Sequence, residues 1–369
     1  MAIKACFIGT QFIGVPSDSG GAIEYLSFNI ARGLAEKGFK VTYFSVDKTK
    51  KFSSENMVIE RFPAKKTNAF FFTLFVLLKS IPKKFDAVYL SGCSMVFAGL
   101  ILSRLKGIPL IYHEFNHNPW IKPNNFLYDF LARLSVKSSD YVIVASGCIK
   151  ERILAQEKIS EKKLLKISNF ACMEEFPIQP GKKQKKVLFV GRAVKHKGMD
   201  FLLELAGKNS KKEWVFVFAC PEASSAEENF YLNKIKSLAA GFPEKVFLRQ
   251  GLSRKELIQE FSSASVLVLP SSQEAFGMVL VEAMACFTPC VVFLACGTKE
   301  IVDDSKNGFL VELGNFNLFE EKLKELMEDE KKRAFFGLNA RKKAEENFSF
   351  EKRIKDFESF FRETAVKEK

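Results

Sequence analysis

Two glutamates eight residues apart, Glu274 and Glu282, have the residue type and spacing that most directly suggest chemistry in this chain. Glu274 lies in a loop after a strand-like run, and Phe276-Gly277 opens the apolar helix that contains Glu282. Glu282 is about two turns into that helix, so its carboxylate should lie on the same side as the helix N-terminus. Carboxylates placed there suit bidentate hydrogen bonds to vicinal sugar hydroxyls. Glu274 could also serve only as a partner of the helix dipole.

A basic loop, residues 191–198, follows the strand-like run that begins at Lys186. Its Arg192 and Lys197 could converge at the carboxyl end of the strand and clamp a diphosphate. Fixed cations of this kind can supply the charge stabilisation that magnesium often provides. A solvated basic loop is the alternative interpretation.

A glycine-rich loop, residues 9–21, joins the first strand-like run to a helix that begins after Gly20-Gly21. A glycine pair lets a phosphate approach the backbone, and the helix N-terminus favours the anion. The GxGxxG spacing of dinucleotide-binding loops is absent, so NAD binding has little support. A loop that needs glycine only for its turn explains the pattern about as well.

Residues 113–117, which begin at His113 and end at His117, match the H-E-x-x-H motif of zinc hydrolases. That chemistry requires both histidines on one face of a helix. Pro109 and Pro119 bracket the motif and the residues before it look like a strand, so a long helix is disfavoured here. Zinc hydrolysis through His113 and His117 therefore stays a less favoured alternative.

The elements that must position these residues form two series of alternating strand and helix patterns. The first series has strands at Lys4–Ile8, Lys40–Ser45, Ala87–Leu90, Pro109–Tyr112 and Tyr141–Val144, with helices such as Gly21–Lys37 and Leu127–Lys137. The second has strands at Lys186–Gly191, Trp214–Ala219, Lys245–Leu248, Ser265–Leu269 and Pro289–Leu294. This alternation predicts an α/β fold of two Rossmann-like, doubly wound domains facing a cleft, with a helical tail. We place the domains at residues 1–178 and 186–345 and the tail at 346–369.

Composition is that of a soluble globular protein, with 47% apolar and 27% charged residues in a chain of 369. We expect a cytoplasmic protein with reduced thiols, because no signal-peptide pattern or membrane-spanning run is seen and the eight cysteines form no CxxC pair. The net charge is +13, and residues 1–180 hold 24 basic against 15 acidic residues. This excess suits an anionic membrane surface or a phosphorylated substrate, or is simply a solvated face. No nucleic-acid-binding motif accompanies it, so nucleic acid is not expected as a partner.

One apolar run, residues 69–78, is bracketed by lysines on both sides. Most runs of this kind are core helices. Its alternative role is a helix that meets an anionic bilayer, which would suit an acceptor on a lipid carrier and a place at the inner face of the cell membrane.

Taken in order, the three loop motifs resemble those of the retaining GT-B glycosyltransferase family, the group-one glycosyl transferases. The most specific part is Pro-Ser-x-x-Glu-x-Phe-Gly-x-x-x-x-Glu-Ala-Met-Ala at residues 270–285, and residues 34–42, 84–88 and 297–302 also match. The resemblance covers nearly the whole chain. It implies transfer of a sugar, with retention, from a UDP- or GDP-sugar to a glycan, a lipid-linked acceptor or a small molecule.

The resemblance also implies a role for each matching residue. Donor binding would involve Gly20 and Gly21 near the phosphates, Arg192 and Lys197 on the diphosphate, Glu274 on the sugar hydroxyls, Glu282 on the ribose, and the backbone of Phe276, Gly277 and Met278. His113 matches the histidine at the family's reaction centre, so His113, Arg192, Lys197 and Glu274 are the expected catalytic residues. No metal or other cofactor is required, and the tail helix would cross back to the first domain.

Two positions depart from the family pattern. Phe287 stands where a glycine usually ends the helix, and phenylalanine is poorly suited to a left-handed backbone. Cys296 replaces the first residue of a usual Gly-Gly pair near the donor sugar. An epimerase that acts on nucleotide sugars, or a binding subunit on the same fold, is the alternative function.

Overall fold

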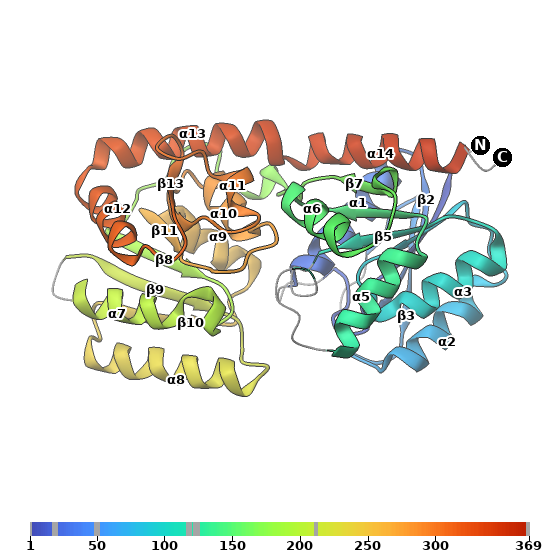
Figure 1. Cartoon of the computed structure of the whole chain (residues 1–369), viewed down its shortest axis with the longest axis horizontal. Coiled ribbons are helices and arrows are strands. Elements are labelled where there is room, and N and C mark those ends of the chain that lie inside the picture. Colours follow the sequence, from blue (N-terminus) through green and yellow to red (C-terminus); the bar gives the residue numbers. More distant parts are fainter. Residues whose placement is uncertain are drawn as a thin grey trace. The chain divides into compact units, whose positions relative to one another are not determined.

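A computed structural model of the chain describes residues 2–16, 21–47, 52–115, 120, 126–209 and 213–366. Contacts divide the chain into two compact units: unit 1 holds Met1–Asn169 and Glu351–Lys369, and unit 2 holds Phe170–Phe350. Each unit contains one parallel sheet with helices packed on it (Figure 1). The prediction of two Rossmann-like α/β domains is confirmed.

Unit 1 contains a seven-stranded sheet in the order β3-β2-β1-β4-β5-β6-β7. Its strands are β1 (Lys4–Ile8), β2 (Lys40–Val46), β3 (Met57–Phe62), β4 (Ala87–Leu90), β5 (Leu110–Glu114), β6 (Tyr141–Val144) and β7 (Leu164–Lys166). Its helices are α1 (Ala22–Glu36), α2 (Ala69–Ser80), α3 (Val96–Lys106), α5 (Phe126–Ser138), α6 (Gly147–Gln156) and nearly all of α14 (Phe350–Val366), with short 3-10 turns at Cys93–Met95 and Glu161–Lys163. From β1 the strands are added on one side of the sheet as far as β3, and from β4 they are added on the other side. The strand order therefore reverses between β1 and β4, and this position is the switch point of the sheet.

An aromatic cluster forms the centre of unit 1. Phe7 of β1 stacks on Tyr89 of β4 with ring centroids 4.4 Å apart, and Tyr43 of β2 lies 6.0 Å away on the neighbouring strand. Phe361 of α14 stacks on Phe7 at 6.0 Å, which attaches the last helix to this sheet. All four rings are buried, so the central strands and α14 share one apolar core.

Unit 2 contains a six-stranded sheet in the order β10-β9-β8-β11-β12-β13. Its strands are β8 (Lys186–Val190), β9 (Val215–Cys220), β10 (Val246–Gln250), β11 (Val266–Leu269), β12 (Cys290–Phe293) and β13 (Gly308–Val311). Its helices are α7 (Met199–Asn209), α8 (Ala226–Gly241), α9 (Arg254–Ser263), α10 (Met278–Ala285), α11 (Thr298–Ile301), α12 (Phe316–Glu328) and α13 (Glu330–Phe348), with 3-10 turns at Met173–Glu175 and Lys195–Lys197. The switch point lies between β8 and β11.

Unit 2 begins earlier than the domain start that we place at residue 186. Ala171 donates its N–H to the Phe348 carbonyl at 2.9 Å and accepts from the Phe350 N–H at 3.0 Å. The stretch 179–185, which lies between the two predicted domains, is held by a hydrogen bond from the Gln184 N–H to the Ser263 carbonyl at 2.8 Å. Residues 170–185 therefore pack as part of unit 2.

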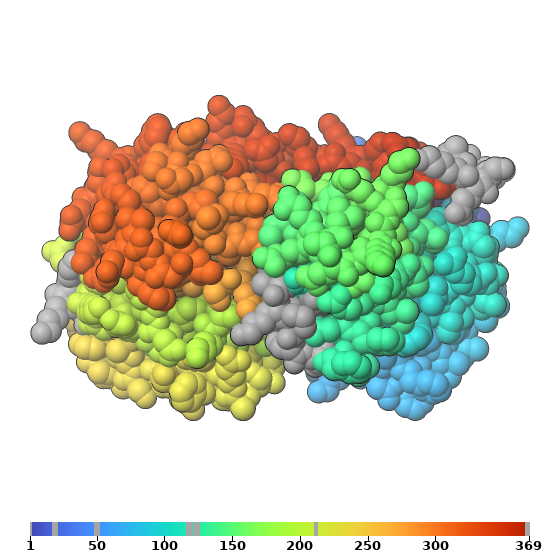
Figure 2. Space-filling view, viewed as in Figure 1, coloured from blue at the N-terminus to red at the C-terminus, as the bar shows by residue number. Residues whose placement is uncertain are grey.

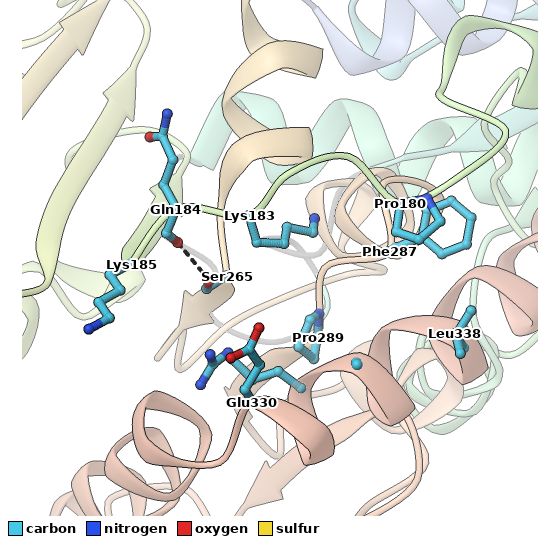
Figure 3. Close-up of a pocket in the computed structure, with 11 residues that line it drawn as sticks. Pro180, Lys183, Gln184, Lys185, Ser265, Phe287, Pro289, Glu330 and Leu338 are labelled. Atoms are coloured by element: carbon cyan, nitrogen blue, oxygen red, sulfur yellow. Dashed lines mark hydrogen bonds between the residues drawn. The ribbon is translucent and has the colours of Figure 1, made fainter.

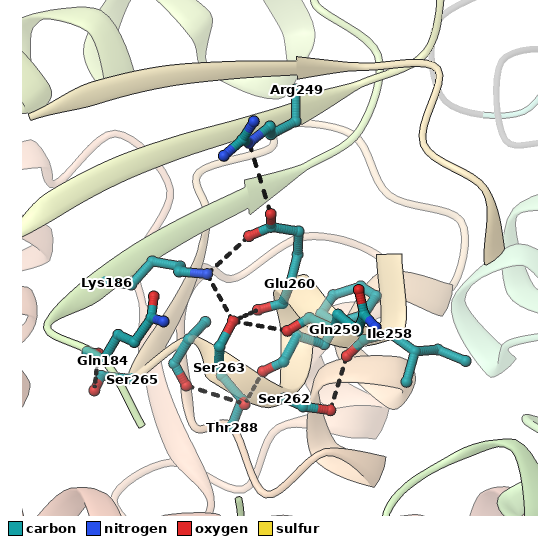
Figure 4. Close-up of polar contacts among 12 residues, drawn as sticks. Gln184, Lys186, Arg249, Ile258, Gln259, Glu260, Ser262, Ser263, Ser265 and Thr288 are labelled. Atoms are coloured by element: carbon teal, nitrogen blue, oxygen red, sulfur yellow. Dashed lines mark hydrogen bonds and ion pairs between the residues drawn. The ribbon is translucent and has the colours of Figure 1, made fainter. Parts of the chain in front are cut away.

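Polar contacts attach the end of α9 to the start of β8 (Figure 4). The buried Lys186 ammonium lies 2.8 Å from Glu260 and 2.6 Å from the Ser263 hydroxyl, and the Ser265 hydroxyl donates to the Gln184 carbonyl at 2.6 Å. Burial strengthens such a pair because water screens it less. These contacts fix α9, whose opposite end carries Arg254, a residue of the candidate site.

Candidate functional site

The predicted basic loop and the first predicted glutamate meet at the switch point of unit 2. Lys197 follows β8 and Glu274 follows β11, and the Lys197 Nζ donates to the Glu274 Oε2 at 2.5 Å. Both side chains are largely buried, at 16% and 13% exposed. Ligands of open parallel sheets bind where the strand order reverses, beyond the carboxyl ends of the strands. The position of this ion pair thus marks the candidate site.

Two glycines bring the loops of this site together. Gly198 has φ +77°, and a Cβ there would lie 2.5 Å from the Pro270 carbonyl oxygen, so only glycine fits without a shift. Gly297 donates its N–H to the Glu274 carbonyl at 2.8 Å, and a Cβ at Gly297 would lie 2.4 Å from the Phe276 Cα. The loop of Glu274 is therefore packed against the loops after β8 and β12.

Arg192, the second predicted cation, does not contact Glu274 but pairs with Glu228 near the start of α8. The Arg192 Nε donates to the Glu228 Oε1 at 2.5 Å, and Ser224 donates to the same carboxylate through both its N–H and its hydroxyl. Burial raises the pKa of Glu228, but these hydrogen bonds outweigh it and hold the pKa below its ordinary value. The Arg192 side chain is 57% exposed, so it can still reach a ligand anion.

Glu282 lies in the middle of α10 and is paired with Arg254 at the start of α9. Arg254 donates to Glu282 and also to Glu175, the latter at 2.9 Å, and its guanidinium lies over the Phe176 ring. Arg254, Glu175 and Glu228 were not predicted from the sequence. A sequence signal for Arg254 was available: the capping-box pattern Ser253-x-x-Glu256 predicts a helix that begins at Arg254.

The N-terminus of α10 is where the backbone of Phe276, Gly277 and Met278 is predicted to bind the donor. Gly277 precedes the helix with φ +106°, a left-handed conformation natural to glycine. The Phe276 side chain is buried and packs edge-on against Phe348 at 5.6 Å. The first N–H groups of a helix have no partner within it, so the backbone at Met278 can offer donors to an anion.

In unit 1, the predicted glycine loop reaches α1 next to a buried acid. Gly20 lies outside the described residues, and Gly21 has φ +105°. A Cβ at Gly21 would lie 2.3 Å from the Glu24 Oε2, and the Thr10 hydroxyl donates to the Glu24 Oε1 at 2.5 Å. Burial raises the pKa of Glu24 above its ordinary value. This carboxyl was not predicted from the sequence, and it lies beside Gly21, where a donor phosphate was expected.

His113 is a fully buried residue of β5. Its Nδ1 lies 2.5 Å from the Tyr89 hydroxyl, its ring stacks on Phe115 at 3.8 Å, and its Nε2 has no hydrogen-bond partner among the described residues. Burial lowers the pKa of His113 to about 3. The imidazole is therefore neutral at physiological pH.

The zinc-hydrolase alternative fails on local structure. His113 and Glu114 are consecutive residues of a strand, so their side chains point to opposite faces rather than along one helix face. Glu114 accepts hydrogen bonds from Tyr112 at 2.9 Å and Trp120 at 3.0 Å, and His117 lies outside the described residues. Within the described ranges no group of three His, Cys, Asp or Glu side chains could hold a metal ion.

A cavity of about 300 Å³ lies at the opposite end of the unit 2 strands from the Lys197–Glu274 pair (Figure 3). Three of its lining residues, Lys185, Ser265 and Pro289, directly precede β8, β11 and β12, so the cavity is at the amino ends of the strands. Lys183 donates to the Cys286 carbonyl and the Thr288 hydroxyl, and burial lowers its pKa to about 8. The cavity is thus separate from the ion pair at the carboxyl ends.

Two family models together account for most of the chain. The model for glycosyl transferases group 1 matches residues 173–343, and the model for glycosyltransferase family 4 matches residues 20–173. Each of the two units thus matches a glycosyltransferase model, on a fold of the GT-B type. The Lys197–Glu274 pair and the Glu282–Arg254 pair both fall within the part matched by the first model.

Relatives and solved structures agree with that assignment. An uncharacterised glycosyltransferase of Haemophilus influenzae is 25% identical over 80% of this chain and 84% of its own. The capsular polysaccharide glycosyltransferase CapM of Staphylococcus aureus is 25% identical over 66% of each chain. Sucrose-phosphate synthase of Thermosynechococcus elongatus has the same fold at a TM-score of 0.82, with 18% identity over 98% of both chains. Anabaena HepE in complex with UDP-glucose follows at a TM-score of 0.78 and 18% identity, over 98% of this chain and all of that one.

Proposed function

We propose that this glycosyltransferase moves a sugar from a UDP- or GDP-sugar to an acceptor hydroxyl with retention at the anomeric carbon. The observation that carries the proposal is the Lys197–Glu274 pair at the switch point of unit 2, with Arg192 on the same loop. A site that places cations beside a carboxylate suits a ligand with both phosphates and sugar hydroxyls. The HepE structure, which contains UDP-glucose, supports a nucleotide sugar as donor.

Each site residue has a distinct role in this proposal. Lys197 and Arg192 bind the diphosphate and stabilise the negative charge that develops on it as it leaves. Glu274 accepts hydrogen bonds from the sugar hydroxyls, and Glu282 accepts from the ribose. The backbone N–H groups at the start of α10, from Phe276 to Met278, complete the donor site.

In the proposed reaction, the bond from the anomeric carbon to the phosphate oxygen breaks while the acceptor oxygen bonds to the same face. The departing phosphate accepts the acceptor's proton, so no separate base is needed. The neutral imidazole of His113 can donate a hydrogen bond from its Nε2 when the Tyr89 hydroxyl donates to Nδ1. His113 thus orients the donor sugar. The protein's own cations supply the charge stabilisation, and we expect no divalent metal to be required.

The acceptor is proposed to be a growing glycan or a lipid-linked sugar. This rests on the similarity to CapM, which is named for capsular polysaccharide biosynthesis. None of the described helices is long and apolar enough to span a membrane.

The first experiment is a thermal-shift panel of nucleoside diphosphates and nucleotide sugars, each with and without EDTA. Stabilisation by one nucleotide series that EDTA does not change supports the proposal and names the donor base. No shift with any nucleotide would refute it. Product analysis with donor alone then separates transfer from epimerisation, since an epimerase would convert the sugar without any acceptor.

A further inference from the structure

Three helices of unit 1 expose an unusual number of large apolar side chains. We call this set the apolar face; its exposed fractions run from 40% to 89%. Its members are Phe70, Phe71, Leu74, Leu78 and Ile81 on or just after α2, Phe97, Ile101 and Leu105 on α3, and Phe126, Leu127 and Phe130 on α5. Single exposed apolar residues are common, but a contiguous group of this size marks an interaction site.

The three helices adjoin one another, so the apolar face is continuous. Helix α3 contacts both α2 and α5, and the surfaces of all three adjoin in the space-filling view (Figure 2). On α3 the exposed residues Phe97, Ile101 and Leu105 recur every four positions and thus lie on one side. The buried side of α2, with Phe72 and Val76, already packs on the core. The apolar face is therefore additional to the side that the fold needs.

Basic residues flank the α2 part of the apolar face. Residues 63–106 contain seven basic residues and a single acidic one, Asp86. Lys65 and Lys66 precede α2, Lys79 lies in its last turn and Lys84 follows it, and all four side chains are exposed. A patch of aromatic and aliphatic residues beside lysines matches a bilayer with anionic headgroups, in which apolar groups enter the interface and lysines meet phosphates.

We propose that the apolar face docks unit 1 onto an anionic lipid bilayer, with α2, α3 and α5 lying along the surface. A second copy of the chain fits less well, because a two-fold contact would place the lysines of one copy against those of the other. The docking goes beyond the proposed sugar transfer and does not depend on it. If the transfer is also correct, docking keeps the enzyme at the surface where a lipid-linked acceptor resides.

The test is co-sedimentation of the full chain with vesicles of phosphatidylcholine alone or with 30% phosphatidylglycerol. We expect binding to the anionic vesicles at least tenfold tighter than to the neutral ones, and weaker binding as salt rises. The triple variant Phe70→Ser/Leu78→Ser/Leu105→Ser should bind at least tenfold less tightly. The matched control is Phe230→Ser/Phe335→Ser, which removes comparably exposed phenylalanines of unit 2 and should bind normally.

A second variant tests the charge. Lys65→Gln/Lys66→Gln/Lys79→Gln should lose most of the preference for anionic vesicles. Its control removes three exposed lysines of unit 2: Lys236, Lys255 and Lys331. Equal loss in control and test variants, or no binding to anionic vesicles, would overturn the proposal. So would a dimer in sedimentation velocity that the serine variant dissociates. Nucleotide thermal shifts on the same variants report separately on the donor site, so the two proposals can fail independently.

Discussion

Lys197 and Glu274, which are 77 residues apart in sequence, form a 2.5 Å ion pair between the loops after β8 and β11. The hydrogen bond to Glu274 fixes the orientation of the Lys197 ammonium, the group that we propose binds the diphosphate. Preorganised charge is catalytically effective because little reorganisation is needed during the reaction. The largely buried position strengthens the attraction between the two groups and the attraction of the Lys197 ammonium for a bound anion.

Replacing Lys197 with glutamine should lower kcat about 100- to 1,000-fold, the loss typical for one group that stabilises transition-state charge. Lys195→Ala is the matched control, since Lys195 lies on the same loop with an exposed side chain, and its rate should stay within about twofold of wild type. Steady-state kinetics with saturating donor measures both. A near-normal rate for Lys197→Gln would remove this residue from the mechanism.

The partnership between the two residues has its own test. Because they contact each other, the effects of Lys197→Gln and Glu274→Gln should not add. The double variant should lose less binding free energy for the nucleotide sugar than the sum of the single losses, by about 1 kcal/mol. Isothermal titration on the four proteins gives this difference, and strict additivity would mean that the pair is not maintained in solution.

Arg254 should stabilise the fold through its ion pair with Glu282. Arg254→Met removes the guanidinium that Glu282 and Glu175 share and leaves the Glu282 carboxylate buried without that charge. Breaking a buried pair costs about 3–5 kcal/mol, but Arg254 is a quarter exposed, so we expect roughly 2 kcal/mol of lost unfolding free energy. Urea denaturation measures the loss. Arg254→Met/Glu282→Gln should recover part of it, since no carboxylate then remains unpaired at position 282.

Most of the fold was predictable from the sequence because buried parallel strands are short continuous apolar runs. β1, β4 and β6 begin and end where the sequence analysis places them. The three strands that were not predicted lie at the edges of the sheets and lack such an apolar run. β3 (Met57–Phe62) is half-exposed and carries Glu60 and Arg61, β7 has three residues, and β13 contains a glycine. Such segments take their strand conformation from the neighbour they pair with, which a local pattern does not reveal.

The candidate site was predictable where motif and loop position coincide, as for Lys197 and Glu274. Their pairing was not, because sequence spacing gives no distance between loops of different strands. Arg254, Glu228 and Glu24 were missed for a related reason. Each is an ordinary charged residue in the first turn of a helix, a position where solvated or dipole-related roles are common. Only the three-dimensional structure shows that each contacts a motif identified from the sequence.

His113 should make stability depend on pH. Its folded-state pKa of about 3 lies below the ordinary value of 6.5, so the unfolded chain binds the proton more tightly. The contribution of the neutral imidazole is complete above pH 6.5 and is lost as the pH falls from 6.5 towards 3. Between pH 8 and pH 5 the loss amounts to about 2 kcal/mol.

The measurement is urea unfolding at several pH values between 8 and 5 for wild type and His113→Gln. The variant is less stable at pH 8 because a packed ring is replaced, but its stability should fall about 2 kcal/mol less across this range. Parallel pH profiles for the two proteins would mean that His113 is accessible to protons in the folded state.

Phe287 is the position at the end of α10 where the chain departs from the family pattern. The structure shows that phenylalanine does adopt the left-handed conformation expected of a glycine there, with φ +57°. The Thr288 N–H donates to the Ala283 carbonyl at 2.9 Å and the Phe287 N–H to that of Met284 at 3.0 Å, which is the hydrogen-bond pattern of a Schellman helix end. The ring is buried, and the Arg341 guanidinium lies over it at 5.4 Å. Ring burial therefore offsets the backbone strain.

Phe287→Ala should cost about 3–5 kcal/mol because the ring is lost and the left-handed strain remains. Phe287→Gly loses the same ring but relieves the strain, so it should be about 1 kcal/mol more stable than Phe287→Ala, the reverse of the usual order. Gly314→Ala calibrates the strain, since Gly314 has φ +88° and a Cβ there meets no atom within 4 Å. Chemical denaturation of the three variants decides the matter: if Phe287→Gly is the less stable of the two, the left-handed backbone at residue 287 does not exist in solution.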